Sequence, residues 1–218
     1  MTKKLHSVFA VMLLAGCAGT VNTPLSTSQA DQMRGRSLVV ATHEKPSFSA
    51  ATATKAMFGA FGAVAMINEG DEIVRTNDVQ DPSVYIAQGI AQSLAQKYDV
   101  ATSTEVNITS TDDVDELSEQ YADSDLILFT RTRGWNFMYF PTDWDNYRVG
   151  LNVTMQLIDR NRRSVLAAAD CAYQPEYADS DEAPSHDYLL SDHAAGLKAE
   201  LKKGADHCLK KFLRETFA

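Results

Sequence analysis

The segment from Tyr147 to Tyr173 restricts the fold of this chain more than any other. Between Tyr147 and Leu157, apolar side chains alternate with polar ones, which is the period of a β-strand with one buried face. A charged turn from Asp159 to Arg163 follows, and an apolar run from Val165 returns as the partner strand. The segment therefore predicts an antiparallel hairpin with one buried face, while its other face is wet or lies beneath polar groups.

The rest of the chain alternates between helical and strand patterns. The clearest helix begins where Asp81 precedes Pro82 and continues to about Tyr98, because Asp is a good N-cap and proline is tolerated in the first turn. Other strands are expected at 38–41, 106–108 and 126–133, and other helices at 50–67, 111–121 and 191–214. The order strand, helices, strand, helix, three strands and helix predicts an α/β domain with a mixed sheet on which the helices pack.

The first seventeen residues have the composition of an export signal. Lys3 and Lys4 precede an apolar run that is too short to span a bilayer. The run ends in Leu14-Ala15-Gly16-Cys17, which resembles the bacterial lipobox. The resemblance implies cleavage before Cys17, acylation of that cysteine by several chains of the palmitate kind, and, because Ala18 rather than Asp follows, a place on the periplasmic face of the outer membrane. The alternative is an ordinary cleaved signal in which the cysteine is incidental.

Residues 18–35 are polar and rich in Ser and Thr, which is typical of a flexible linker. We therefore expect a signal peptide over 1–16, a lipidated cysteine and flexible tether over 17–35, and a single periplasmic domain over 36–218. The formal net charge of -9 becomes -11 without the two lysines of the signal. An acidic chain repels phosphate, so nucleic acid is not an expected partner.

The expected domain contains two cysteines, Cys171 and Cys208. Export places them in an oxidising compartment, where pairing is the default. Cys171 lies near the end of the return strand, and Cys208 lies on the apolar face of the last helix. A disulfide between them would attach this helix to the sheet. Two free buried thiols and a metal-binding pair are the alternatives.

The sequence contains no local motif for catalysis. It has no Gly-x-Ser-x-Gly elbow, phosphate loop, dinucleotide fingerprint or His-Glu-x-x-His. Acidic residues between 174 and 187 offer oxygens that calcium could use, but their spacing does not match an EF-hand, so a solvated loop is expected there. We therefore expect a protein that is not an enzyme and that carries no cofactor and no metal.

Two apolar segments are candidate contact surfaces. The thirteen residues 135–147 hold six aromatic side chains, which are typical of protein interfaces, although the alternation over 135–139 fits a core strand equally well. Residues 56–67 are apolar on nearly every side of a helix, so they must be covered by their own domain, by another subunit or by lipid, and burial in their own domain is the first expectation. The candidate partner-binding residues are Trp135, Phe137, Tyr139, Phe140, Trp144, Phe58 and Phe61.

Taken with the lipobox, the order of elements resembles the periplasmic domain of outer-membrane assembly lipoproteins, the CsgG/PelC/LpoB-like domain. The strand over 38–41, the helix over 82–98 and the hairpin over 147–173, with Leu157-Ile158-Asp159 at the end of its first strand, carry the resemblance. It implies a non-catalytic accessory or assembly factor of an envelope machine, anchored in the outer membrane and acting by contact with an envelope protein or with its own copies. The alternative is a carrier for a small apolar or lipidic ligand, with Met57, Phe58 and Phe61 lining a pocket.

Overall fold

The computed structural model describes residues 22–218. The predicted signal peptide and Cys17 lie outside these residues. The strands are β1 (Ser37–His43), β2 (Ser49–Ala51), β3 (Ala101–Thr109), β4 (Leu126–Phe140), β5 (Asp143–Asp159) and β6 (Ser164–Tyr173). The helices are α1 (Thr27–Asp31), α2 (Ala53–Ala56), α3 (Gly59–Thr76), α4 (Pro82–Tyr98), α5 (Val114–Gln120) and α6 (His186–Glu215), with a 3₁₀ turn at Ser180–Glu182.

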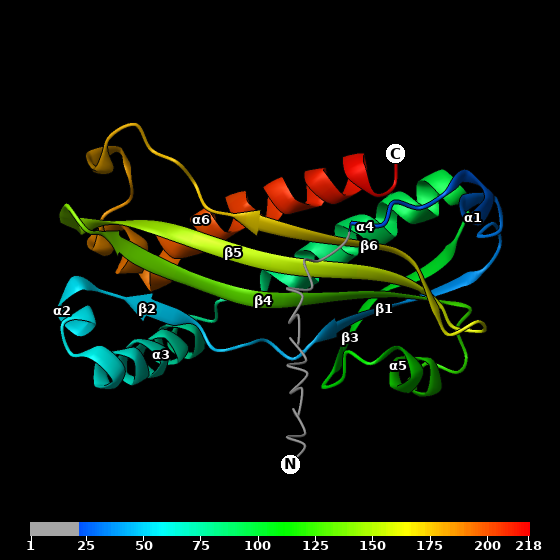
Figure 1. The fold of residues 1–218 in the computed structure, drawn as a ribbon, viewed down its shortest axis with the longest axis horizontal. Coiled ribbons are helices and arrows are strands. Elements are labelled where there is room, and N and C mark those ends of the chain that lie inside the picture. The colour runs from blue at the N-terminus through cyan, green and yellow to red at the C-terminus, as the bar shows by residue number, and fades with distance from the viewer. Residues whose placement is uncertain (1–21) are drawn as a thin grey trace, which may run out of the picture.

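The strands form one mixed sheet in the order β3-β1-β4-β5-β6, and β2 pairs with the far part of β4. β1 runs parallel to β3 and β4, whereas β4, β5 and β6 are antiparallel to their neighbours. Helices α4 and α6 cover one face of the sheet, α5 lies on the other face, and α3 lies beside the edge strand β2 (Figure 1). The predicted α/β class with a mixed sheet and packed helices is therefore confirmed.

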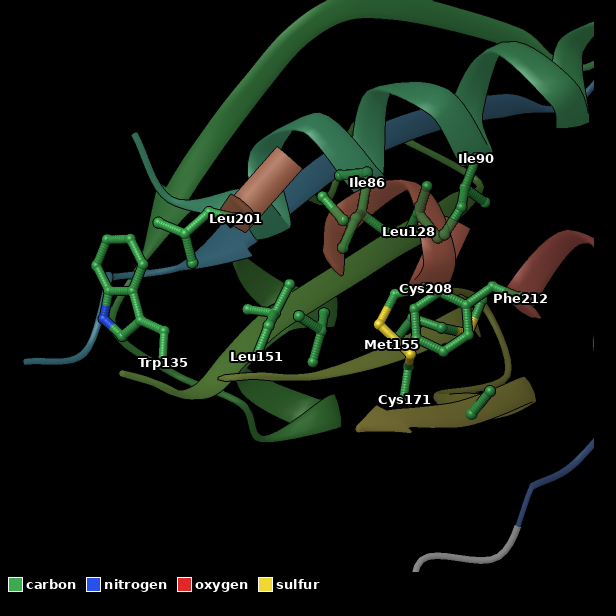
Figure 2. Packing of buried hydrophobic residues seen from close by; sticks show 14 of the residues in the cluster. Ile86, Ile90, Leu128, Trp135, Leu151, Met155, Cys171, Leu201, Cys208 and Phe212 are labelled. Carbon is green, nitrogen blue, oxygen red and sulfur yellow. A yellow bond between two sulfur atoms is a disulfide. The ribbon is translucent and has the colours of Figure 1, made fainter. Parts of the chain in front are cut away.

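The larger core lies between the sheet and the two long helices. In α4, Asp81 accepts a hydrogen bond from the backbone N–H of Ser83 at 2.8 Å, which caps the helix as predicted. One stripe of this helix, formed by Ile86, Ile90 and Leu94, is fully buried and faces the apolar side chains of β4 and β5 (Figure 2). A smaller cluster beneath α5 buries Leu117 against the other face of the sheet.

The last helix is attached to the sheet by the predicted disulfide. Cys171 of β6 and Cys208 of α6 are bonded, with a Cα–Cα distance of 5.5 Å, and the bond lies beside Phe212 and Met155 (Figure 2). The helix starts earlier than predicted, at His186, and residues 191–194 interrupt it with non-helical backbone angles. Its longer part, after this interruption, carries Cys208.

The flexible tether predicted over 17–35 is wrong for residues 22–35. Thr23 exchanges two backbone hydrogen bonds with Ala168 of β6, at 2.7 and 2.9 Å, and Leu25 donates a backbone hydrogen bond to Thr216. Ser26 caps α1, and Met33 is fully buried in the core. The polar composition of this segment concealed its few apolar side chains, which are enough to pack it on the domain.

Two other predicted boundaries moved. The helix predicted over 50–67 is β2, then α2, then α3, which continues to Thr76. The strand predicted over 126–133 continues as β4 to Phe140, so most of the aromatic segment 135–147 is strand rather than loop. Asp113 caps the short helix α5.

The turn after β5 is connected to the start of β1 by a buried carboxylate. Asp159 has no exposed side-chain surface, and it accepts hydrogen bonds from Arg36 at 3.0 Å and from Arg162 at 2.7 Å. Burial by itself would raise the pKa of Asp159, but the hydrogen bonds from the two arginines and from the backbone of Arg162 outweigh it and hold this pKa below its usual value.

We expect the double substitution Cys171→Ser with Cys208→Ser to lower the free energy of unfolding by about 4 kcal/mol, because the disulfide closes a loop of about 37 residues in the unfolded chain. Urea unfolding measures the loss. Reductant should lower the stability of the wild type by a similar amount and leave the double variant unchanged. Equal stability of the two proteins without reductant would contradict the expectation.

We expect Asp159→Asn to lower the free energy of unfolding at pH 7 by roughly 2 to 4 kcal/mol, because it leaves Arg36 without its buried partner. The folded pKa of Asp159 is depressed, so the stabilisation is complete above the unfolded pKa and is lost as the pH falls through the folded pKa. Urea unfolding between pH 7 and pH 2 should therefore show a shallower acid decline for the variant. Identical acid slopes would show that another carboxylate is responsible.

Candidate functional site

The structure divides the candidate aromatic residues into core and surface. Trp135 is 2% exposed, and its indole N–H donates a hydrogen bond to the carbonyl oxygen of Pro46 at 2.9 Å. Phe137 is fully buried. Phe48, which the sequence analysis did not single out, packs edge-on against both rings, with centroid distances of 5.3 and 5.7 Å. Trp135 and Phe137 are therefore core residues, and their prediction as partner-binding residues is wrong.

The next two candidates are also mostly covered by their own domain. Phe140 is nearly buried, lies 6.3 Å from the ring of Tyr177 and has the guanidinium of Arg148 over its face at 4.4 Å. Tyr139 is half-buried and packs against the edge of the main core. Neither ring is free to enter a partner without rearrangement.

Trp144 differs from these four. It lies at the start of β5, just after the turn from β4, and 58% of its surface is exposed. Met138, on the opposite side of β4 from Phe137, is also largely exposed. The alternation of strand side chains could have identified Met138 once Phe137 was known to face the core.

The predicted burial of residues 56–67 in their own domain is wrong. Met57, Phe58 and Phe61 are 74%, 66% and 87% exposed, and Val64 and Ile67 are also exposed. The physical reason lies in two glycines of α3. A Cβ atom on Gly62 would lie 1.8 Å from the carbonyl oxygen of Lys55, and one on Gly70 would lie 2.0 Å from that of Phe48. The helix lies close to α2 at Gly62 and to Phe48 at Gly70, and Val74 near its end enters the core, so the larger apolar side chains of its first half point outward.

The charged residues near α3 lie on either side of its apolar first half. No charged residue occurs between Ala56 and Asn68. Lys55 and Glu69 form an ion pair at 2.5 Å. Further along α3, hydrogen bonds from Arg75 and Thr76 hold the pKa of Glu72 below its usual value, so this carboxylate is charged at neutral pH.

The exposed apolar side chains of α2, α3 and the β4–β5 hairpin lie at one end of the molecule. The pairing of Ala51 with Met138 carries α2 to the end of the hairpin, and Figure 1 shows both at the same end, opposite α1. We call this surface the distal end, and it consists of Met57, Phe58, Phe61, Val64, Ile67, Met138 and Trp144. Contiguous apolar patches on a monomer usually mark a contact surface.

The predicted ligand pocket does not form from the expected residues, because Met57, Phe58 and Phe61 point into solvent. A shallow cavity of about 310 Å³ lies elsewhere, between the start of α4 and α6. Its lining includes the apolar residues Val79, Pro82, Leu201 and Ala205 and the rim lysines Lys198 and Lys202.

Within residues 22–218, no three His, Cys, Asp or Glu side chains gather as metal ligands would. Two histidines lie against aromatic rings, His186 beside Tyr147 and His207 beside Tyr173. None of the helices in this part of the chain is long and apolar enough to cross a bilayer.

No family model matches the sequence, and no curated protein matches it. Similar solved structures include the PelC dodecamer from Paraburkholderia phytofirmans, which is 14% identical over 90% of this chain and 94% of that chain, with a TM-score of 0.38. Lipoprotein GNA1162 from Neisseria meningitidis is 11% identical over 79% and 99%, with a TM-score of 0.28. The LpoB C-terminal domain from Salmonella enterica is 13% identical over 68% and 92%, with a TM-score of 0.20. PelC and LpoB, both named in the predicted resemblance, are thus among the similar structures, at scores too low to establish a shared function.

The two tryptophans form a matched pair for testing this division. We expect Trp135→Ala to lower the free energy of unfolding by roughly 3 to 5 kcal/mol, because it empties a buried site and leaves the Pro46 carbonyl without its donor. We expect Trp144→Ala to change it by less than about 0.5 kcal/mol. Thermal and urea unfolding of both variants measure the difference. Similar losses for the two would mean that Trp144 also packs in the domain.

Proposed function

We propose that this protein is a lipid-anchored, non-catalytic factor on the periplasmic face of the outer membrane, and that it serves an envelope machine by protein contact. The observation that carries the proposal is the distal end, an apolar surface left uncovered on an otherwise well-packed domain. Such a surface is enriched in aromatic and methionine side chains, as protein interfaces are, and its helical part, residues 56–68, carries no charge.

The position of the N-terminal segment supports tethered binding. Thr23 is held on β6 by two hydrogen bonds, and it lies six positions after Cys17. Six residues span at most about 20 Å, so an acylated Cys17 would keep the domain next to the membrane. Confinement to such a thin layer raises the effective concentration of the domain for a membrane-bound partner without any new contact.

The hairpin part of the distal end, Met138 and Trp144, is the proposed protein contact. Trp144 is an exposed rigid ring near the tip of two long, paired strands, and such rings bury much area at a small entropic cost. The partner is an envelope protein or a second copy of this chain.

A carrier for a small apolar ligand is the second candidate function. The cavity between α4 and α6 supports it, because its volume of about 310 Å³ lies at the lower limit of ligand pockets. Organic extraction of the purified protein followed by mass spectrometry tests it. A stoichiometric lipid that Leu201→Trp removes would favour this function over protein contact.

The anchor and the contact are tested separately. Radiolabelled palmitate should label the wild type and not Cys17→Ala, and the absence of label on the wild type would contradict the anchor. For the contact, a photo-crosslinking amino acid at position 144 should form a discrete adduct in cells. The control is position 165, an exposed apolar site that pairs with Ile158 at the other end of β5.

We expect the adduct at position 144 and none of that mass at position 165. An adduct of twice the mass of the chain would identify a second copy as the partner, and a larger or smaller one would identify another envelope protein. No adduct at 144, or the same adducts at both positions, would contradict contact through the hairpin tip.

A further inference from the structure

The start of α3 is apolar around an unusually large part of its circumference. Between Gly59 and Ile67, only Gly62 and Met66 are not exposed. Because successive residues of a helix are rotated by about 100°, the exposed side chains span about 200°, and none of them is polar. A helix that packs against a single neighbour needs an apolar stripe only about half as wide. The exposed side chains on this arc are Ala60, Phe61, Ala63, Val64, Ala65 and Ile67.

We propose that the α2–α3 turn and the first two turns of α3 insert into the headgroup region of a phospholipid bilayer. A rigid protein partner would cover one side of such a helix, whereas a lipid layer surrounds it. The inference rests on the lipid anchor of the proposed function, because an acylated Cys17 would hold the bilayer within reach of the domain. It assigns lipid to the helical part of the distal end and leaves Met138 and Trp144 for protein.

The charges at the base of α3 limit the depth of insertion. The Lys55–Glu69 ion pair lies where the apolar segment ends, and the nine steps along the chain from Gly59 to Asn68 rise by about 14 Å along the helix axis. Interfacial helices bury their apolar face by about 5 to 10 Å. The apolar part of α3 is therefore long enough for an interfacial position and too short to cross the bilayer.

The backbone at the start of α3 also favours the headgroup layer over the hydrocarbon. No side chain caps this helix, so its first N–H groups need acceptors. Hydrocarbon offers none, and each uncovered N–H group would be costly there. Phosphate and ester oxygens of the headgroup layer can accept these hydrogen bonds.

Two attachment points would orient the domain on the membrane. Ala168, which pairs with Thr23, lies opposite Gln156 of β5. Gln156 is thirteen positions after Asp143 at the hairpin turn, which is on the order of 40 Å of strand. A bilayer held by both Cys17 and α3 would lie along the long axis of the molecule (Figure 1). Because the chain is acidic and the inserted segment carries no charge, binding should not require anionic lipid.

The test uses the mature chain, residues 17–218, with Cys17→Ser, so that no acyl chain contributes to binding. The probe is vesicles of phosphatidylethanolamine and phosphatidylcholine, and the measurement is co-flotation in a sucrose gradient. We expect the protein to float with the vesicles, and the double substitution Phe58→Ser with Phe61→Ser to lower the bound fraction at least tenfold. Ile108→Ser, an exposed apolar position on β3, is the matched control and should float like the parent.

Circular dichroism and light scattering complete the test. The Phe58→Ser, Phe61→Ser variant should keep the thermal midpoint of the parent, because both rings are exposed. Failure of the parent to float, or equal flotation of the double variant, would overturn the proposal whether or not palmitate labels Cys17. An oligomer that the double substitution dissociates, with no flotation of the parent, would also overturn it and identify the helix as a contact between copies.

Discussion

The pairing of β4 with β5 is the constraint on which the rest of the structure depends. These strands have 15 and 17 residues, far more than the average strand. β4 has room for two parallel partners in succession, β1 at its start and β2 near its end. β5 carries β6, which in turn holds the N-terminal segment and, through the disulfide, α6. The hairpin thereby connects the N-terminal segment to the distal end.

The distal end follows from the way in which the second half of β4 is covered. β2 and Phe48 bury Trp135 and Phe137, and the short connection from β2 then places α2 and α3 at the hairpin tip. Gly62 and Gly70 are the close-packed positions in the first part of α3, and of its large apolar side chains only those near its end, Ile73 and Val74, pack on the core. Each exposed ring forgoes roughly 1.5 to 3 kcal/mol of burial, which favours binding to something that covers it. Lipid around α3 and a protein at Trp144 would use the two parts of this surface.

Much of the fold could be predicted because its signals are local. The alternation from Tyr147 to Leu157, the Asp81–Pro82 cap and the facing positions of Cys171 and Cys208 all correspond to elements of the structure. The aromatic segment could not be assigned in the same way, because a strand face has the same period whether it meets its own core or a partner. The decision depended on Phe48, which is 87 positions before Trp135 in the chain. The polar composition of residues 22–35 was misleading for a similar reason. Burial of a single apolar side chain, Met33, helps to pack this segment on the domain, although most of its neighbours are polar.

By itself, the sequence determined the α/β class, the order of most elements and the disulfide. It also determined that the chain is acidic and that residues 56–67 carry no charge. Those properties depend on residues near one another in the chain or on composition. Only the tertiary structure decided which apolar residues are exposed to solvent. Trp144 is exposed whereas Trp135 is buried, and in the region of α3 Phe58 and Phe61 are exposed whereas Gly62 and Gly70 are buried. Burial depends on which distant segment arrives to cover a side chain, and on the closest approach that two backbones can reach, and neither is encoded in a local pattern.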